Sequence, residues 1–331
     1  MPKKFLKNFR RNKNCRLCRS KNLTKVIDLG KTPLANSFTK NVKKKALFVP
    51  LGVEFCKKCF HLQLTHIVNP KKMFDSYLYV SGTSNVTIDH FKSYAKDLRR
   101  IFKTQKKVKI IDIASNDGTF LNNFKSKKFD AYGIDPAKNL NDGIKNNKLK
   151  IITGYFSKKK SEEIRNKYGQ FDIITANNVF AHVDNLIDFS KGVKNIIKKE
   201  GIFVFEVSYL LDVLKKNTFD TIYHEHMSFH SFLPLEKFFN KLGMRIFNFK
   251  LLDVQGGSIR LYVCNENSKY IKNEKINSLK KNELEIYNID KIKTYRKLQK
   301  NILLKKNRVN RDISEKLKKG KNLVGYGAAA K

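Results

Sequence analysis

Short apolar segments alternate with longer lysine-rich segments through the middle of this chain, and this alternation most limits the folds that it can adopt. The apolar segments of strand length are residues 108–114, 131–135, 150–154, 171–176 and 201–207. Segments long enough for helices separate them, and residues 119–125 are expected to form the first of these helices. Strands that alternate with helices predict a doubly wound, parallel α/β sheet.

The segments outside this central region have different patterns. Residues 244–249 and 258–263 are two apolar runs joined through Gly256-Gly257, which predicts a terminal β-hairpin in which Cys264 is a buried strand residue. Helices are expected from about residue 69 to residue 104, and again after residue 266, packed against the central domain. The expected domains are a metal-binding module at 1–66, a helical connector at 67–104, a central domain at 105–265 and a C-terminal segment at 266–331.

Four of the five cysteines form two Cys-x₂-Cys pairs, Cys15/Cys18 and Cys56/Cys59. Two such pairs supply the four thiolates of a closed, tetrahedral structural zinc site. The sequence shows no secretory signal after Met1, so we expect a reducing, cytoplasmic location in which cysteine pairs hold metal and do not form disulfides. Redox-active or unpaired thiols are the alternative interpretation.

The charge of the chain is extreme. Its 331 residues include 69 Lys and Arg against 29 Asp and Glu, a formal net charge of +40. Such a charge fits a nucleic-acid or membrane surface, but the lysines are scattered among Asn and Ile in every segment, as biased codon usage would produce. No run of about 18 apolar residues could span a membrane. We therefore expect no membrane and no specific nucleic-acid partner, with a dedicated polyanion surface as the alternative.

Polar residues follow the first two predicted strands, where ligands bind in open α/β sheets. The first strand leads into Asp112-Ile-Ala114-Ser-Asn116-Asp117-Gly118, and Asp135 ends the second. This loop has neither the dinucleotide fingerprint nor a Walker lysine. Gly118 allows a close approach to a ligand, Asp112 and Asp117 suit a cationic group, and Asp135 suits ribose hydroxyls. The set predicts S-adenosylmethionine (AdoMet), with a capping Asp and an ordinary turn as the alternative.

Three of the seven histidines lie close together, in Tyr223-His224-Glu225-His226 and at His230. The spacing is not the His-Glu-x-x-His of zinc proteases, so acid–base chemistry is the better interpretation. His226 could take a proton, Glu225 could orient an imidazole, and Tyr223 could bind a developing oxyanion. His182 follows the fourth strand, so it also points toward the ligand crevice.

In their order along the chain, these motifs resemble the C-methyltransferases that act on nucleotide-linked 4-ketohexoses. The resemblance rests on the two cysteine pairs and on residues 77–82, 116–118, 223–226, 256–260 and 325–331. It implies a class I AdoMet-dependent methyltransferase sheet (Rossmann-like), an N-terminal zinc-binding domain and a C-terminal domain that helps to hold the nucleotide sugar. In that family the motif at 325–331 opens the C-terminal nucleotide-binding fold, so ending at Lys331 predicts a truncated C-terminal domain.

The reaction that the resemblance implies is deprotonation next to a ketone, followed by methyl transfer to that carbon. The expected catalytic residues are His226 as the base, Glu225, Tyr223, His182 and, over the sugar, Tyr79 or less favourably Tyr77. The expected AdoMet-binding residues are Asp112, Ala114, Asn116, Asp117, Gly118, Asp135 and Asn177. A nucleic-acid methyltransferase is an alternative, although Asn177-Asn-Val-Phe180 is not the Asn-Pro-Pro-Tyr motif of such enzymes, and a non-catalytic binding fragment is another. The sugar, the methylated carbon and the oligomeric state stay open.

Overall fold

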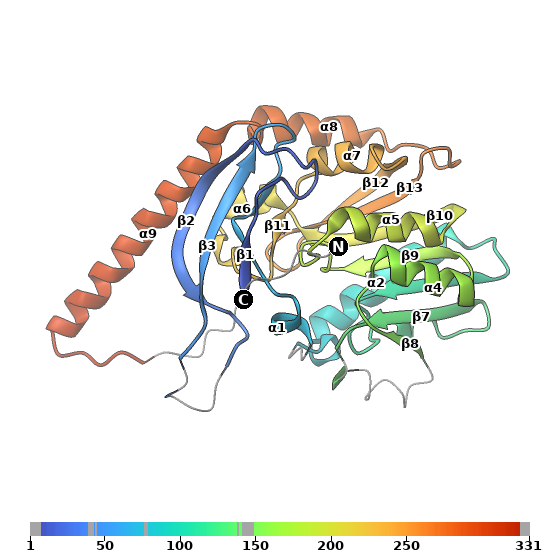
Figure 1. The fold of residues 1–331 in the computed structure, drawn as a ribbon, viewed down its shortest axis with the longest axis horizontal. Helices are drawn as coiled ribbons and strands as arrows, with labels where there is room; N and C mark the ends of the chain where they lie inside the picture. Colours follow the sequence, from blue (N-terminus) through green and yellow to red (C-terminus); the bar gives the residue numbers. More distant parts are fainter. Residues whose placement is uncertain are drawn as a thin grey trace.

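A seven-stranded sheet, a four-stranded sheet, a two-stranded pair and the helices around them make up the described part of the molecule, shown in Figure 1. The computed structural model describes residues 8–38, 43, 45–75, 79–137, 139–140 and 149–324. Within these ranges, no helix is both long enough and apolar enough to cross a membrane.

The larger sheet contains the strands that the alternating pattern predicted. Its strands are β6 (Val108–Ile113), β7 (Phe129–Asp135), β8 (Lys150–Thr153), β9 (Phe171–Asn177), β10 (Ile197–Ser208), β12 (Met244–Leu252) and β13 (Ser258–Asn265). They are arranged in the order β12-β13-β10-β9-β6-β7-β8. The five strands from β10 to β8 are parallel, whereas β13 is antiparallel to both of its neighbours. The predicted doubly wound sheet and its terminal hairpin are confirmed.

Both faces of this sheet are covered, because successive side chains of a strand point to opposite faces. Ile111 and Ile113 of β6 pack in one cluster with residues of α4 (Lys158–Tyr168) and α5 (Leu186–Ile196). Val108 and Ile110 pack on the other face, against α2 (Asn85–Ile101). A strand that is buried on both faces has to be apolar throughout, which is why these segments were recognisable in the sequence.

The helix expected at residues 119–125 is not present. The structure has only a short 3₁₀ turn, Leu121–Phe124. The Asn123 side chain donates hydrogen bonds to the carbonyl oxygens of Thr119 (3.3 Å) and Phe120 (3.0 Å). Such local side-chain bonds compete with the hydrogen bonds of an α-helix, so this prediction was wrong.

The smaller sheet belongs mainly to the N-terminal part of the chain. It contains β2 (Leu23–Pro33), β3 (Phe48–Cys56), β4 (Leu62–Leu64) and β11 (Ser228–Phe229), in the order β11-β4-β3-β2. A separate pair joins β1 (Phe9–Arg11) to β5 (His66–Val68). Strand β11 directly follows the histidine-rich stretch, so the N-terminal sheet extends into the region that was expected to carry the chemistry.

The connector is less regular than its pattern predicted. Before α2 it contains only α1 (Lys71–Phe74) and a 3₁₀ turn at Ser81–Thr83. Helix α2 begins after Ser84, whose hydroxyl oxygen accepts a hydrogen bond from the backbone N–H of Thr87. This N-cap satisfies one of the free N–H groups of the first helical turn.

The remaining elements follow β10 along the chain. They are α6 (Leu210–Lys216), a 3₁₀ turn at Phe219–Thr221, α7 (Phe232–Asn240), α8 (Lys275–Lys281), a π turn at Asn282–Ile286 and α9 (Ile292–Lys318). The buried carboxylate of Glu283 accepts hydrogen bonds from the N–H groups of Phe232 and Leu233, at the start of α7, and from the hydroxyl of Tyr209. The segment around α8 is thereby fastened to the central domain, as expected.

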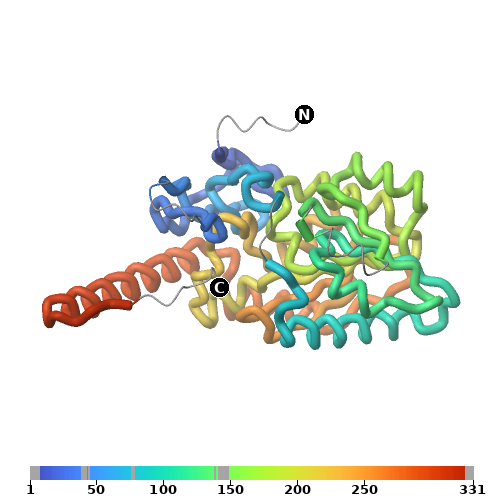
Figure 2. Tube along the Cα trace, turned by 90° about the horizontal axis from the view of Figure 1, so that it is seen from below, coloured from blue at the N-terminus to red at the C-terminus, as the bar shows by residue number. Residues whose placement is uncertain are grey.

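Helix α9 departs from that expectation. Its first turns pack on the N-terminal sheet, where the rings of Tyr295 and Phe55 are 5.3 Å apart and the Gln299 side chain bonds to the backbone of Asp28. The far half of the helix projects from the body of the molecule, as Figure 2 shows. The helices after residue 266 thus divide between the two sheets, and the motif at 325–331 lies outside the described residues.

Candidate zinc centre and active site

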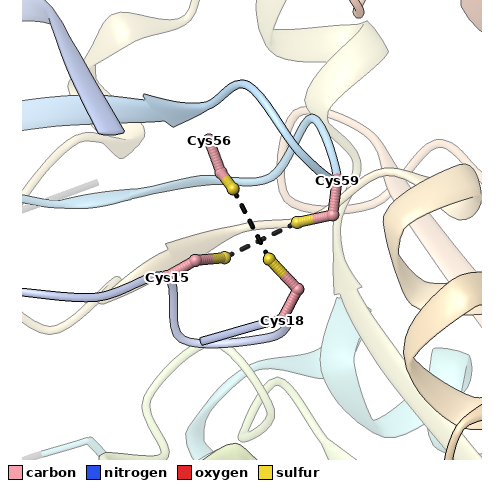
Figure 3. Close-up of side chains that lie close together, drawn as sticks. All are labelled: Cys15, Cys18, Cys56 and Cys59. Carbon is pink, nitrogen blue, oxygen red and sulfur yellow. Dashed lines mark hydrogen bonds between the residues drawn. The ribbon is translucent and has the colours of Figure 1, made fainter. Parts of the chain in front are cut away.

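The four paired cysteines converge on one point. Their Sγ atoms all lie within 4.8 Å of one another, with 3.5 Å between Cys15 and Cys59 and 3.6 Å between Cys18 and Cys56 (Figure 3). Four sulfurs bound at about 2.3 Å to a tetrahedral zinc would be about 3.8 Å apart. Hydrogen bonding among the thiols raises the pKa of Cys15 to about 12 and lowers the pKa of Cys56. A cation is what allows all four to be thiolates together, so the residues fit structural zinc.

The two cysteine pairs have the same local turn. Arg19 and Phe60, each directly after the second cysteine of its pair, have left-handed backbones with φ of 64° and 69°. The Arg19 N–H donates to the carbonyl of Cys15 (3.0 Å), and the Phe60 N–H donates to that of Cys56 (2.8 Å). Left-handed conformations are costly for residues other than glycine. Their repetition at equivalent positions marks a shaped metal site that the sequence did not reveal.

The loop after β6 has an alternating backbone. Ala114, Asn116 and Gly118 all have positive φ, at 56°, 51° and 76°. Only one of these positions is a glycine, so the loop did not resemble a glycine-rich ligand loop in the sequence. The N–H groups of Ala114 and Gly118 donate to the carbonyl oxygens of Ile134 and Ser115, so the loop is held in a tight turn. The missing side chain of Gly118 lets a ligand approach this turn closely.

This loop lies at the point where the strand order of the sheet reverses, between β6 and β9, the usual ligand position in such sheets. Asp112 is buried there and accepts a hydrogen bond from the Thr175 hydroxyl (2.6 Å). Burial raises the pKa of Asp112 to about 7. Asn177 Oδ1 is also buried and has no hydrogen-bond partner among the described residues. An unpaired buried acceptor beside a carboxyl group fits the ammonium and sulfonium groups of AdoMet.

Asp135 fixes the shape of the loop. Its two carboxylate oxygens accept hydrogen bonds from the N–H groups of Asn116 (2.9 Å) and Ala137 (2.8 Å). Each carboxylate oxygen can accept more than one hydrogen bond, so the same group can also bind the hydroxyls of a ribose. Burial raises the pKa of Asp135.

Asn116 and Asp117 hold the segment that precedes α2. Asn116 Nδ2 donates to the carbonyl of Tyr79, Asn116 Oδ1 accepts from the N–H of Ser81, and both distances are 2.9 Å. Asp117 Oδ2 accepts from the N–H of Gly82 (2.8 Å). A Cβ atom at Gly82 would lie 2.7 Å from that oxygen, so a larger residue would displace the Asp117 carboxylate from this hydrogen bond. These side chains bring the connector onto the ligand loop, a role that the spacing of the motifs had not predicted.

Tyr79 lies in this segment. Its hydroxyl is 3.5 Å from Thr87 Oγ1, and the residue is 45% exposed. Its predicted contact with a sugar stays a prediction. Tyr77 falls outside the described residues.

The histidine-rich stretch and His182 do come together. The rings of His182 and His226 are 5.0 Å apart and nearly perpendicular, and the N–H of Met227 donates to the carbonyl of Ala181 (2.9 Å). His226 Nδ1 donates to the carbonyl of Thr221 (2.8 Å). In a neutral imidazole this leaves the lone pair on Nε2, which accepts a hydrogen bond from the Tyr223 hydroxyl (3.1 Å). A buried, oriented imidazole of this kind can act as a general base.

The N-terminal module supports the same stretch. Glu225 Oε1 accepts a hydrogen bond from the Asn36 side chain (2.6 Å), and His224 Nε2 bonds to the carbonyl of Val49 (3.2 Å). Both residues are buried. The zinc-binding part of the chain therefore forms one wall of the candidate active site.

Sequence reasoning missed a buried charged network at the edge of the crevice. Glu206 is paired in register with Asn177, and its carboxylate bonds to His90 (2.6 Å) and to Arg260 (2.5 Å). The Arg260 guanidinium also lies 3.5 Å from the centre of the Tyr94 ring. The sequence pattern that selected Asp135, a carboxylate at the end of an apolar strand, also applies to Glu206 and could have identified it.

Three family models match successive parts of the chain. Residues 15–74 match a family model described as "Putative zinc binding domain", residues 86–247 match "Methyltransferase domain", and residues 253–331 match "C-methyltransferase C-terminal domain". The C-methyltransferase NovU of Streptomyces niveus is 32% identical over 256 residues, which are 76% of this chain and 60% of NovU. The chain thus spans less than two thirds of the length of that relative.

Solved methyltransferases resemble about half of the chain. An S-adenosylmethionine-dependent methyltransferase from Clostridium acetobutylicum is 16% identical, with a TM-score of 0.43 over 53% of this chain and 92% of that one. Magnesium protoporphyrin IX methyltransferase from Synechocystis PCC 6803 with bound SAH is 9% identical, with a TM-score of 0.43 over 57% and 90%. The order of the three matching domain models and the sheet topology show a class I methyltransferase sheet with an N-terminal zinc-binding domain, in a chain that is similar to the C-methyltransferase NovU over 76% of its length.

Proposed function

We propose that the protein transfers a methyl group from AdoMet to a carbon atom of a small nucleotide-linked 4-keto sugar. The observation that carries the proposal is the orientation of His226, whose Nδ1 is bound to a backbone carbonyl and whose Nε2 faces Tyr223 beside His182. A carbon atom becomes a nucleophile only when it loses a proton, and a position next to a ketone makes that loss possible. The site therefore needs an oriented base and oxyanion donors.

The chain's own residues divide this work. His226 Nε2 takes the proton from the carbon next to the ketone, and the Thr221 carbonyl stabilises the imidazolium that results. The Tyr223 hydroxyl, already next to Nε2, donates a hydrogen bond to the enolate oxygen, and the His182 ring lies 5.0 Å from the His226 ring. Bound AdoMet supplies an electrophilic methyl group. Asp112, Asn177, Asp135 and the loop from Ala114 to Gly118 would hold it.

Three observations support a nucleotide sugar as the substrate class. The motifs resemble those of the 4-ketohexose C-methyltransferases, the relative NovU is named a C-methyltransferase, and residues 253–331 match the C-terminal domain of such enzymes. The active-site side chains are mostly buried imidazole, phenol and carboxyl groups, which suit a small keto substrate better than a polymer.

The proposal can be tested with the protein, AdoMet and a panel of nucleotide-linked 4-keto sugars. Mass spectrometry should show a gain of one methyl group on one member of the panel. In deuterium oxide, the same sugar should exchange the hydrogen next to its ketone. His226→Asn should abolish both methyl transfer and exchange and leave AdoMet affinity nearly unchanged, because the imidazole acts on the sugar. His66→Asn, a half-buried histidine in β5, is the matched control.

Exchange at the parental rate in the His226→Asn protein would move the role of base to another residue, with His182 the first candidate. Methyl transfer to a specific RNA or DNA sequence, with no product from any sugar, would overturn the substrate class.

A further inference from the structure

Arg16 lies inside the first zinc-binding pair, between Cys15 and Cys18, yet its side chain points into the protein. It is only 4% exposed, and burial lowers the pKa of its guanidinium to about 10. A buried charged group is costly unless it is paired or hydrogen-bonded. The buried charge of Arg16 therefore has to be compensated by specific contacts.

Those contacts go to the candidate active site. Arg16 Nε donates to the hydroxyl of Ser228 (3.0 Å), and a terminal nitrogen of the guanidinium donates to the carbonyl of Val183. Asp184, 3.8 Å from the guanidinium, supplies the opposite charge. Ser228 is two residues after His226, and Val183 directly follows His182. One side chain from the zinc loop thus joins the two segments that carry the paired imidazoles.

The backbone of the loop is also fixed. The Arg16 N–H donates to Gln63 Oε1 (2.7 Å) in β4, the strand that pairs with β11. His61 Nε2 contacts the same Ser228 hydroxyl at 3.2 Å. The path from the metal ligands to the imidazoles therefore consists of buried hydrogen bonds, with Arg16 at its centre.

We propose that Arg16 is a positioning residue, which couples the zinc-bound loop to the relative placement of His182 and His226. In this arrangement the zinc fixes the loop, the loop fixes the guanidinium, and the guanidinium fixes the two segments. The role in catalysis rests on the proposed function, whereas the coupling itself can be measured without substrate.

The first test measures nuclear magnetic resonance signals of ¹³C-labelled histidine rings in the full chain. The signals of His182 and His226 are assigned by their loss in His182→Gln and His226→Asn. Arg16→Gln should shift both ring signals and change their pH titration, with zinc content unchanged. Arg19→Gln is the matched control, because Arg19 is next to the same pair and its guanidinium makes an exposed hydrogen bond to the Asn185 side chain (3.1 Å). Chelating the zinc from the parental protein should shift the same two signals. Signals unchanged in Arg16→Gln and after chelation would overturn the proposal.

The second test measures methyl transfer to the nucleotide 4-keto sugar. Arg16→Gln should lower kcat by about 10–100-fold, the usual range for residues that orient metal-site or catalytic groups, with the KM for AdoMet unchanged. Arg16→Lys should recover part of the loss, because it keeps the charge and one donor. Equal loss in Arg16→Lys and a raised KM for AdoMet would indicate a purely structural role and contradict the proposal.

A folding defect in Arg16→Gln would be recognised by circular dichroism. Ser228→Ala then replaces it, since this variant removes the acceptor of the guanidinium and deletes a single oxygen atom. Shifted histidine signals without methyl transfer in the parental protein would support the coupling and refute the proposed function. Methyl transfer that is unaffected by Ser228→Ala, together with unshifted histidine signals, would support the proposed function and refute the coupling.

Discussion

At the scale of single residues, Asp112 shows how a position in the sheet changes the chemistry of a side chain. It is buried in β6, where, among the described residues, the Thr175 hydroxyl (2.6 Å) and the Asn177 amide (3.4 Å) donate hydrogen bonds to its carboxyl group. Burial raises its pKa to about 7, and the neighbouring Asp135 acts in the same direction. Near neutral pH this carboxyl group is therefore divided between its neutral and ionised forms.

This pKa predicts a pH dependence of AdoMet binding. A cationic ligand favours the ionised carboxylate, so affinity should rise as pH increases through about 7. The stability of the free protein should change in the opposite direction. The folded pKa lies above the value of about 3.9 for an unfolded chain, so this group's contribution to the free energy of unfolding falls as pH rises from about 4 to about 7.

Calorimetry with AdoMet between pH 5.5 and 8.5, in two buffers of different ionisation enthalpy, measures the affinity and the proton released. Asp112→Asn should remove most of the pH dependence. Asp253→Asn, an exposed Asp paired with Lys216, should keep it. An unchanged pH profile in Asp112→Asn would show that another group titrates on binding.

At the scale of elements, strands β3, β4 and β11 connect the metal to the chemistry. Strand β3 ends at Cys56, the turn to β4 contains Cys59, and β4 pairs with β11 directly after the histidine-rich stretch. The zinc-binding turn is thus also the turn of a hairpin whose second strand supports the candidate base. Such small metal-bound elements depend on their ion for folding.

Zinc removal should therefore disorder this hairpin. Protein purified without added zinc should contain close to one equivalent of it, and Cys56→Ser should lose most of that zinc and unfold at a lower temperature. Metal analysis and a melting curve provide the measurement. Cys264→Ser makes the same chemical change in the buried strand β13, away from the cluster, and should keep its zinc. Equal zinc and equal melting in Cys56→Ser and the parental protein would refute the four-cysteine site.

At the scale of the whole molecule, the charge of +40 has to be reconciled with a site for a small ligand. Many lysines form ion pairs on the surface, such as Lys150 with Asp130 and Lys250 with Asp97, and such exposed pairs contribute little to stability. Other charges are buried where elements meet, and Arg16 and the Glu206–Arg260 pair are examples.

The excess of surface lysine predicts binding to nucleic acids that depends on salt and not on sequence. Counterion release should make the logarithm of the affinity for DNA fall linearly with the logarithm of the salt concentration. Fluorescence anisotropy with several unrelated DNA and RNA oligonucleotides tests this. Similar affinities across the set, each weak near physiological salt, are expected. A large preference for one sequence, accompanied by its methylation, would contradict the assignment of a sugar substrate.

The sequence by itself determined the parts of the protein that local pattern encodes. The strands of the central sheet, its terminal hairpin and the buried place of Cys264 followed from runs of apolar residues, because a strand covered on both faces has to be apolar. The four cysteines followed from spacing, because two short turns bring each pair together whatever surrounds them. Asp112, Asp135 and His182 were proposed as site residues from their position near the ends of strands, and their roles stay predictions.

Only the tertiary structure decided the contacts between residues far apart in the chain. Arg16 meets Ser228, Asn116 binds the backbone of Tyr79 and Ser81, and β11 joins β4. The left-handed backbones of Ala114 and Asn116 are likewise set by the packing of the loop between two strands. Periodicity and spacing carry information over a few residues, whereas these contacts depend on how whole elements pack against one another, and that packing brings the zinc loop to the imidazoles.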